Sequence, residues 1–184
     1  MTIDPSLIVG LCWVAFLVAW AILAAIHGRS GKRSSSAGAV GLRLLLVATV
    51  YLGIFYSDSL RPFGDFTDSA ATAGVMLCIV GLQFAVWARV TLGRSWGMPM
   101  TLHENPELVT GGPYRYVRHP IYTGLSAMLI GTSLVFPLAA APCLGLVAYS
   151  AFAARREERD MEQRFPDMYP QYKRHSKFLV PFLL

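Results

Sequence analysis

Long apolar blocks constrain the fold of this 184-residue chain more than any other feature. The first block runs from Leu7 to Ile26 and holds twenty residues without a charge, the length that an α-helix needs to cross a bilayer. Four further blocks lie at about Val40–Tyr56, Ala70–Val90, Pro120–Phe136 and Ala139–Ala154. We therefore predict an all-α integral membrane protein with five transmembrane helices.

The basic residues predict how these helices are oriented. The chain carries 16 lysines and arginines, and with five spans fifteen of them fall on one side while only Arg61 falls on the other. The positive-inside rule makes the basic side cytoplasmic, so we expect the N-terminus outside and the C-terminus in the cytoplasm. Because topology accounts for the net charge of +5, the charge gives no reason to expect a nucleic acid partner.

Three cysteines, Cys12, Cys78 and Cys143, all fall inside apolar blocks and show no CxxC spacing. This pattern predicts neither a disulfide framework nor a metal site. We expect all three to be small core residues or lipid-facing residues.

The segment from Gly111 to Gly124 is the part of the chain richest in side chains that can bind a ligand or catalyse a reaction. It holds tyrosines, arginines and a histidine between a glycine-proline turn and an apolar run. Pro120 favours an extended conformation at His119 and suits the first position of a helix. We therefore expect His119 at the mouth of a helix, where free N–H groups favour an anionic group. The alternative is a juxtamembrane loop, in which Arg115 and Arg118 are equally well explained as headgroup anchors.

The charged tail from Arg155 to Phe165 is predicted to continue the fifth helix out of the bilayer, sharing the cytoplasmic side with the connection before Pro120. A solvated helix held by surface ion pairs is the alternative, since Arg156/Asp160 and Asp160/Arg164 are spaced four residues apart. We expect the helix to be broken at Pro166 and Pro170. The apolar segment Phe178–Leu184 is too short to span and is expected to fold back against the bundle or the interface.

Several of these segments together resemble the isoprenylcysteine carboxyl methyltransferase family, which are integral membrane enzymes that use S-adenosyl-L-methionine. The resemblance depends on the order and spacing of four pieces: Pro106-Glu107-Leu108-Val109, Gly111-Gly112-Pro113-Tyr114, Arg118-His119-Pro120-Ile121-Tyr122, and Glu157-Glu158 with the aromatic residues of the tail. It covers about residues 70–184, which corresponds to the catalytic half of that family. One structural domain is expected, in which residues 1–69 supply two transmembrane helices and residues 70–184 form the catalytic core.

The resemblance implies methyl transfer to a lipophilic or prenylated acceptor at the cytoplasmic face of a plasma membrane or prokaryotic inner membrane. If the roles of the matching family residues apply here, the cofactor would be bound by Glu107, Leu108, Val109, Tyr114, His119, Pro120 and Tyr122. Catalysis would involve Arg156, Glu157 and Glu158. The family arginine lies about one turn before the acidic pair, where this chain has Ala153, so Arg155 or Arg156 would have to substitute.

Other functions stay open at this point. An arginine would hold a carboxylate acceptor, whereas a lipid amine or a small thiol would need Glu157 or Glu158 as proton acceptor. Membrane sterol reductases have a similar His-Pro-x-Tyr-x-Gly run, so an NADPH-dependent reductase is the alternative from another class. A membrane module without catalytic activity is the third.

Overall fold

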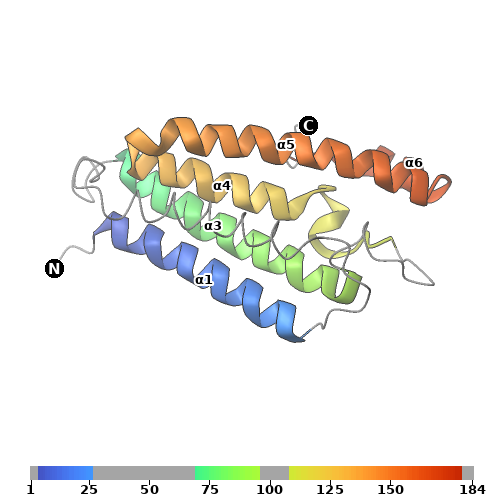
Figure 1. The fold of residues 1–184 in the computed structure, drawn as a ribbon, viewed down its shortest axis with the longest axis horizontal. Coiled ribbons are helices and arrows are strands. Elements are labelled where there is room, and N and C mark those ends of the chain that lie inside the picture. The colour runs from blue at the N-terminus through green and yellow to red at the C-terminus, as the bar shows by residue number, and fades with distance from the viewer. Residues whose placement is uncertain (1–3, 27–68, 96–107, 180–184) are drawn as a thin grey trace, which may run out of the picture.

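The computed structural model describes residues 4–26, 69–95 and 108–179, and these fold mainly into helices (Figure 1). Four long helices lie side by side: α1 (Pro5–Ile26), α3 (Ser69–Leu92), α4 (Pro120–Val135) and α5 (Ala140–Arg164). A short helix α6 (Met168–His175) follows α5. The all-α prediction is confirmed for these residues, whereas the predicted second span lies outside them.

Within residues 4–26, 69–95 and 108–179, three helices are long and apolar enough to cross a membrane. They are α1, α3 and the run Pro137–Arg164, which joins the short 3-10 helix η4 (Pro137–Ala139) to α5. The fourth predicted span is a helix where expected, but α4 has only 16 residues. At 1.5 Å per residue it is about 24 Å long, shorter than the ~30 Å apolar layer of a bilayer.

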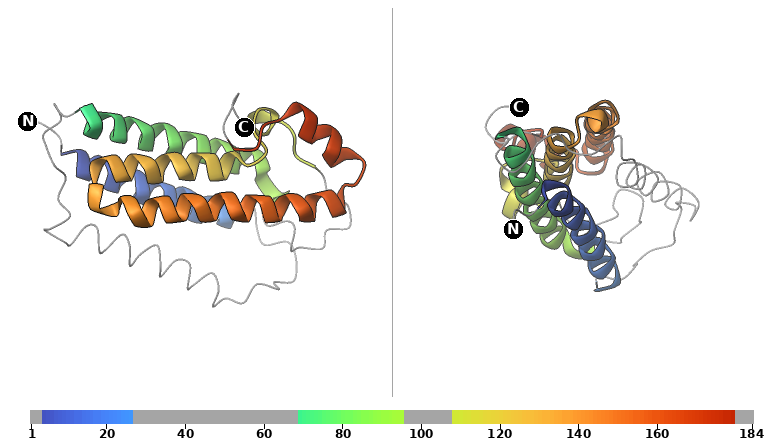
Figure 2. Two further views of the ribbon diagram at one scale, coloured as in Figure 1. Left: turned by 90° about the horizontal axis from the view of Figure 1, so that it is seen from above. Right: turned by 90° about the vertical axis from the view of Figure 1, so that its left-hand side faces the viewer.

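The direction of the helices brings distant segments to one end of the bundle. In Figures 1 and 2, α1, α3 and α5 run in the same direction and α4 runs in the opposite one. A tight turn at Phe136–Ala139 causes the reversal between α4 and α5, so these two helices form a hairpin. The end of α3, the start of α4 and the charged half of α5 therefore meet.

Small residues allow α3 and α4 to pack closely. A Cβ atom added to Gly81 would lie 2.6 Å from the carbonyl oxygen of Gly124, and one added to Gly74 would lie 2.6 Å from that of Gly131. Between these two contacts Cys78 is fully buried, and Cys12 and Cys143 are buried in the same core. The prediction that the cysteines are small core residues is confirmed.

A buried arginine, Arg89, links the ends of α1 and α3. It is 1% exposed and donates hydrogen bonds to the carbonyl oxygens of Gly93 (3.1 Å) and Leu23 (3.4 Å). Carbonyl groups at helix C-termini lack partners within the helix and favour a cation. Arg89 therefore fixes the end of α1 against the end of α3.

The tail agrees with the predictions in two respects and differs from them in one. α5 ends at Arg164, which confirms the expected break at Pro166. α5 continues without a break from Ala140 to Arg164, which confirms that the tail extends the fifth helix. Pro170 does not break a helix, because it is the third residue of α6, where its missing N–H group costs nothing. Asp160 forms no ion pair with a described residue, so the alternative of a tail helix held by the pairs Arg156/Asp160 and Asp160/Arg164 is not supported.

Candidate functional site

A compact turn positions the start of α4. Gly112 opens a short 3-10 helix, η3 (Gly112–Arg115), with φ +58, a conformation that glycine adopts without strain. A side chain there would also collide with Thr91 of α3, whose Oγ1 would lie 2.9 Å from its Cβ. The chain then reaches His119, which precedes Pro120 at the start of α4, as predicted. The His119 side chain makes no capping hydrogen bond to this helix, so its ring is available for other contacts.

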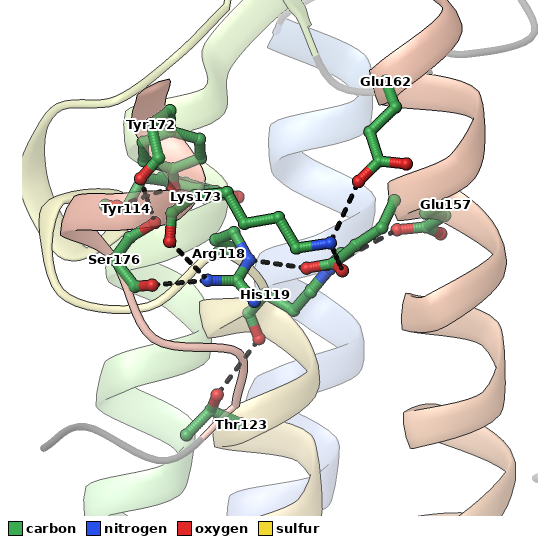
Figure 3. Close-up of polar contacts among 10 residues, drawn as sticks. Tyr114, Arg118, His119, Thr123, Glu157, Glu162, Tyr172, Lys173 and Ser176 are labelled. Carbon is green, nitrogen blue, oxygen red and sulfur yellow. Dashed lines mark hydrogen bonds and ion pairs between the residues drawn. The ribbon is translucent and has the colours of Figure 1, made fainter. Parts of the chain in front are cut away.

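The His119 ring lies between two carboxylates of α5 (Figure 3). Its Nδ1 atom is 3.7 Å from Oε2 of Glu157, and its Nε2 atom is 3.6 Å from Oε1 of Glu158. Both distances exceed those of ordinary hydrogen bonds. The residue is only 8% exposed, and Nε2 is buried without a hydrogen-bond partner. A buried polar atom in this condition is a place where a ligand can bind.

The two carboxylates have different surroundings. Glu158 is buried, and its oxygens contact Nε of Arg118 (2.5 Å) and Nζ of Lys173 (3.1 Å). Burial by itself would raise the pKa of Glu158, but contacts with His119, Arg118 and Lys173 lower it to about 2. The Glu157 side chain is 40% exposed and accepts a hydrogen bond of 2.6 Å from the Tyr122 hydroxyl. Glu158 is therefore held as an anion within the fold, whereas Glu157 faces outward beside Tyr122.

The segment after α6 folds back onto the start of α4. The backbone N–H of Arg118 donates to the carbonyl of Lys177 (2.8 Å), and the N–H of Lys177 donates to the carbonyl of Tyr116 (2.9 Å). The Arg118 guanidinium also donates to the carbonyl of Ser176. The ring of Phe178 packs edge-on against His119 at 5.4 Å between centroids. For residues 178 and 179 this confirms the predicted return of the C-terminal segment, which we call the strap (Ser176–Leu179).

Most of the described candidates from the sequence lie at this end of the bundle. Tyr114 is buried in η3, and burial raises the pKa of its hydroxyl above the ordinary range. Its carbonyl accepts a hydrogen bond from the Tyr172 hydroxyl of α6 (2.7 Å). Leu108 and Val109 are half-buried at the start of this segment, whereas Glu107 lies outside the described residues.

Arg156 is not part of the cluster. Each residue of an α-helix advances about 100°, so Arg156 lies roughly 160° around α5 from Glu158. Its side chain is exposed on that other face.

Sequence reasoning missed two members of the site. From the sequence, Arg118 was explained equally well as a headgroup anchor or as a ligand-binding residue. Its position directly before His119 was the signal that could have identified it as part of the site. Lys173 gave no signal, because its contact with Glu158 depends on how α6 returns along α5. Both contribute the positive charge that allows a carboxylate to be buried here.

Comparison with known proteins adds the chemistry. A family model described as phospholipid methyltransferase matches residues 69–168, which include α3, α4 and α5. A probable protein-S-isoprenylcysteine O-methyltransferase from Oryza sativa subsp. japonica is 27% identical over 89% of this chain and 88% of its own length. Protein-S-isoprenylcysteine O-methyltransferase A from Arabidopsis thaliana is 33% identical over 60% of this chain and 58% of its own length. The nickel-cobalt-cadmium resistance protein NccN from Alcaligenes xylosoxydans xylosoxydans is 30% identical over 78% of this chain and 65% of its own length.

Proposed function

We propose that this chain, which belongs to the phospholipid methyltransferase family of integral membrane methyltransferases, transfers a methyl group from S-adenosyl-L-methionine to a lipophilic acceptor. The observation that carries the proposal is the buried His119 ring, which lies between Glu157 and Glu158 while its Nε2 atom has no hydrogen-bond partner. We place the catalytic core in residues 70–184 and the reaction at the cytoplasmic face of a plasma membrane or prokaryotic inner membrane. The concentration of basic residues at one end supports that orientation.

The residues at the start of α4 fit the cofactor. The Nε2 atom of His119 has no hydrogen-bond partner in the protein and can form a hydrogen bond to polar groups of the cofactor. Tyr122 and Tyr114 offer aromatic faces of the kind that attract a cation such as a sulfonium. When bound, the cofactor supplies a methyl group on a positively charged sulfur, which leaves as a neutral thioether. We propose that the pocket is completed by Pro120 and the segment that holds Glu107, Leu108 and Val109.

The two carboxylates of α5, Glu157 and Glu158, have different roles in this proposal. A carboxylate with a pKa of about 2 is a poor proton acceptor near neutral pH, so Glu158 serves to position His119, Arg118 and Lys173. Glu157 is partly exposed and oriented by Tyr122, so it is the residue that can receive a proton from an acceptor. The other contribution of the chain is to align the reacting groups and exclude water.

The acceptor follows from which charges are available. Methylation of a prenylated cysteine carboxylate, the activity named for the plant relatives, would need a cation to hold the carboxylate. Arg118 and Lys173 already contact Glu158, and Arg156 faces away from it. Arg155 lies over the ring of Phe178, which packs against His119, so it is the cation placed to hold a carboxylate acceptor. The position of Glu157 favours a second candidate, a lipophilic amine or thiol that loses a proton on methylation.

The cofactor is tested by calorimetric titration of the detergent-purified protein with S-adenosyl-L-methionine, S-adenosylhomocysteine and NADPH. We expect micromolar-range affinity for the first two and none for NADPH, as is usual for enzyme ligands. His119→Ala should abolish this binding, whereas His175→Ala, which alters an exposed histidine of α6, should retain it. Binding of NADPH alone would replace the methyltransferase proposal with a reductase. Normal affinity in His119→Ala would remove His119 from the site.

The acceptor is tested by supplying a farnesylated cysteine, a phosphatidylethanolamine and a long-chain thiol with labelled cofactor. If the acceptor loses a proton, Glu157→Gln should lower turnover by about 100-fold, the usual contribution of a general base, and should leave cofactor affinity unchanged. If only the farnesylated cysteine is methylated and Glu157→Gln has no effect, the methyl acceptor is a carboxylate.

A further inference from the structure

The aromatic ring of Phe178 in the strap contacts basic side chains from two other segments. The guanidinium carbon of Arg118, just before α4, lies 5.8 Å from the ring centroid, and that of Arg155 in α5 lies 5.9 Å from it. The His119 ring packs edge-on against the same ring, with 5.4 Å between the centroids. Phe178 therefore connects Arg155 to the site around His119.

The two arginines differ in what else holds them. Arg118 is fixed by Glu158, whose Oε1 lies 2.5 Å from its Nε atom, and by the carbonyl of Ser176. Arg155 is exposed, and in the part of the chain that the structure describes it forms neither an ion pair nor a hydrogen bond. A guanidinium is attracted to the face of an aromatic ring. The ring of Phe178 is therefore the contact that restrains the Arg155 side chain.

The place of Arg155 on α5 suits contact with an acceptor. It is the first charged residue after the apolar part of this helix. It precedes Glu158 by three residues, so it lies roughly 60° around the helix from Glu158 and about 4.5 Å closer to the apolar part. An acceptor whose apolar chain lies in the bilayer would present its polar end at this level.

We propose that Phe178 is a positioning residue whose ring holds the Arg155 guanidinium beside His119. Arg155 then gives the acceptor site a preference for a negatively charged polar end, and Phe178 acts on that preference only through Arg155. Without the ring, Arg155 would be a solvated cation on a flexible side chain. This inference rests on the proposed function, because it concerns the acceptor of the same reaction.

The test measures binding of a farnesylated cysteine and of its methyl ester to the full chain in neutral detergent, with and without S-adenosylhomocysteine. We expect the original chain to bind the acid more tightly than the ester. Arg155→Gln should weaken binding of the acid about tenfold, as for one lost hydrogen bond between charged groups. Phe178→Leu keeps an apolar side chain beside His119 but removes the aromatic face, and should weaken it about fivefold. Binding of the ester should not change in either variant.

Two further variants separate positioning from a general structural effect. Phe178→Leu combined with Arg155→Gln should bind the acid no more weakly than Arg155→Gln alone, because residues that act as a unit are not additive. Phe178→Trp retains an aromatic face and should keep the preference for the acid. Additive losses, or equal weakening of acid and ester in Phe178→Leu, would overturn the positioning role.

The matched controls are Phe152→Leu and Arg159→Gln, which make the same two changes at exposed positions of α5. Both should bind the acid as the original chain does, and losses equal to those at Phe178 and Arg155 would overturn the inference. Equal affinity of the original chain for acid and ester would overturn it as well. In that case, normal binding of S-adenosylhomocysteine in the same samples would leave the methyltransferase proposal standing.

Discussion

At the level of single residues, the site depends on a carboxylate that is buried and still ionised. Removing a carboxylate from water costs several kcal/mol unless hydrogen-bonded cations compensate for it. Arg118 and Lys173 provide that compensation for Glu158 from two segments that are far from it in the sequence. The same contacts hold α4, α5 and α6 together beside His119.

Replacement of Glu158 should make stability depend on pH in a defined direction. The folded-state pKa of Glu158, about 2, lies below its ordinary value of 4.5. The contribution is therefore fully present above pH 4.5 and lost as the pH falls toward 2, with a size of about 3 kcal/mol. Thermal unfolding in detergent should find Glu158→Gln less stable than the original chain at pH 7 and nearly equal to it near pH 2. A constant difference across this range would contradict the assignment.

Arg118 and its neighbour Arg115 should differ sharply when truncated. Arg118→Ala leaves Glu158 buried without its closest cation, which typically costs about 3–5 kcal/mol. Arg115→Ala removes an exposed side chain and should change stability by less than about 0.5 kcal/mol. The free energies of unfolding of the two variants check this. Similar values would mean that Arg118 is the headgroup anchor that the sequence also allowed.

At the level of elements, close packing of α3 against α4 sets the position of His119. Gly124 lies five residues after His119, and a Cβ atom there would lie 2.6 Å from the carbonyl oxygen of Gly81 and 2.7 Å from the backbone nitrogen of Ala85. Backbone atoms of a helix cannot yield as a flexible side chain can. A larger residue would therefore separate the two helices and displace the helix mouth.

Gly124→Ala should destabilise the protein by about 1–3 kcal/mol, the usual cost of overpacking. It should also weaken binding of S-adenosyl-L-methionine, because α4 carries His119. Gly145→Ala in α5 is the matched control, since a Cβ atom there meets nothing within 4 Å and alanine favours a helix. Melting temperature and cofactor affinity measured together check both effects. Tolerance of Gly124→Ala would mean that α4 shifts freely against α3.

At the level of the whole molecule, the chain closes on itself at the functional end. The strap joins the residues before α4 through backbone hydrogen bonds, and the hydroxyl of Tyr172 bonds to the carbonyl of Tyr114. These contacts link α6 and the strap to the turn that precedes His119. The C-terminal segment therefore belongs to the site.

Loss of one backbone donor should loosen this closure. Lys177→Pro removes the N–H group that bonds to Tyr116, whereas Lys177→Ala keeps it and changes only an exposed side chain. We expect faster hydrogen exchange across Met168–Leu179 and about tenfold weaker cofactor binding in the proline variant, which corresponds to the ~1.4 kcal/mol of one lost hydrogen bond. Identical exchange in the two variants would indicate that the strap is not held by this bond.

The sequence by itself determined which segments are helical and where the chemistry lies. Uncharged blocks of sufficient length predict α1, α3, α4 and α5, and proline and glycine place His119 at a helix mouth, because both signals act over a few residues. Helical periodicity alone would also have placed Arg156 opposite Glu158. Only the tertiary structure decided that Arg118 and Lys173 compensate Glu158, that Pro170 begins α6 rather than ending a helix, and that the strap covers His119. Those features depend on contacts between residues far apart in the chain, which local patterns do not encode.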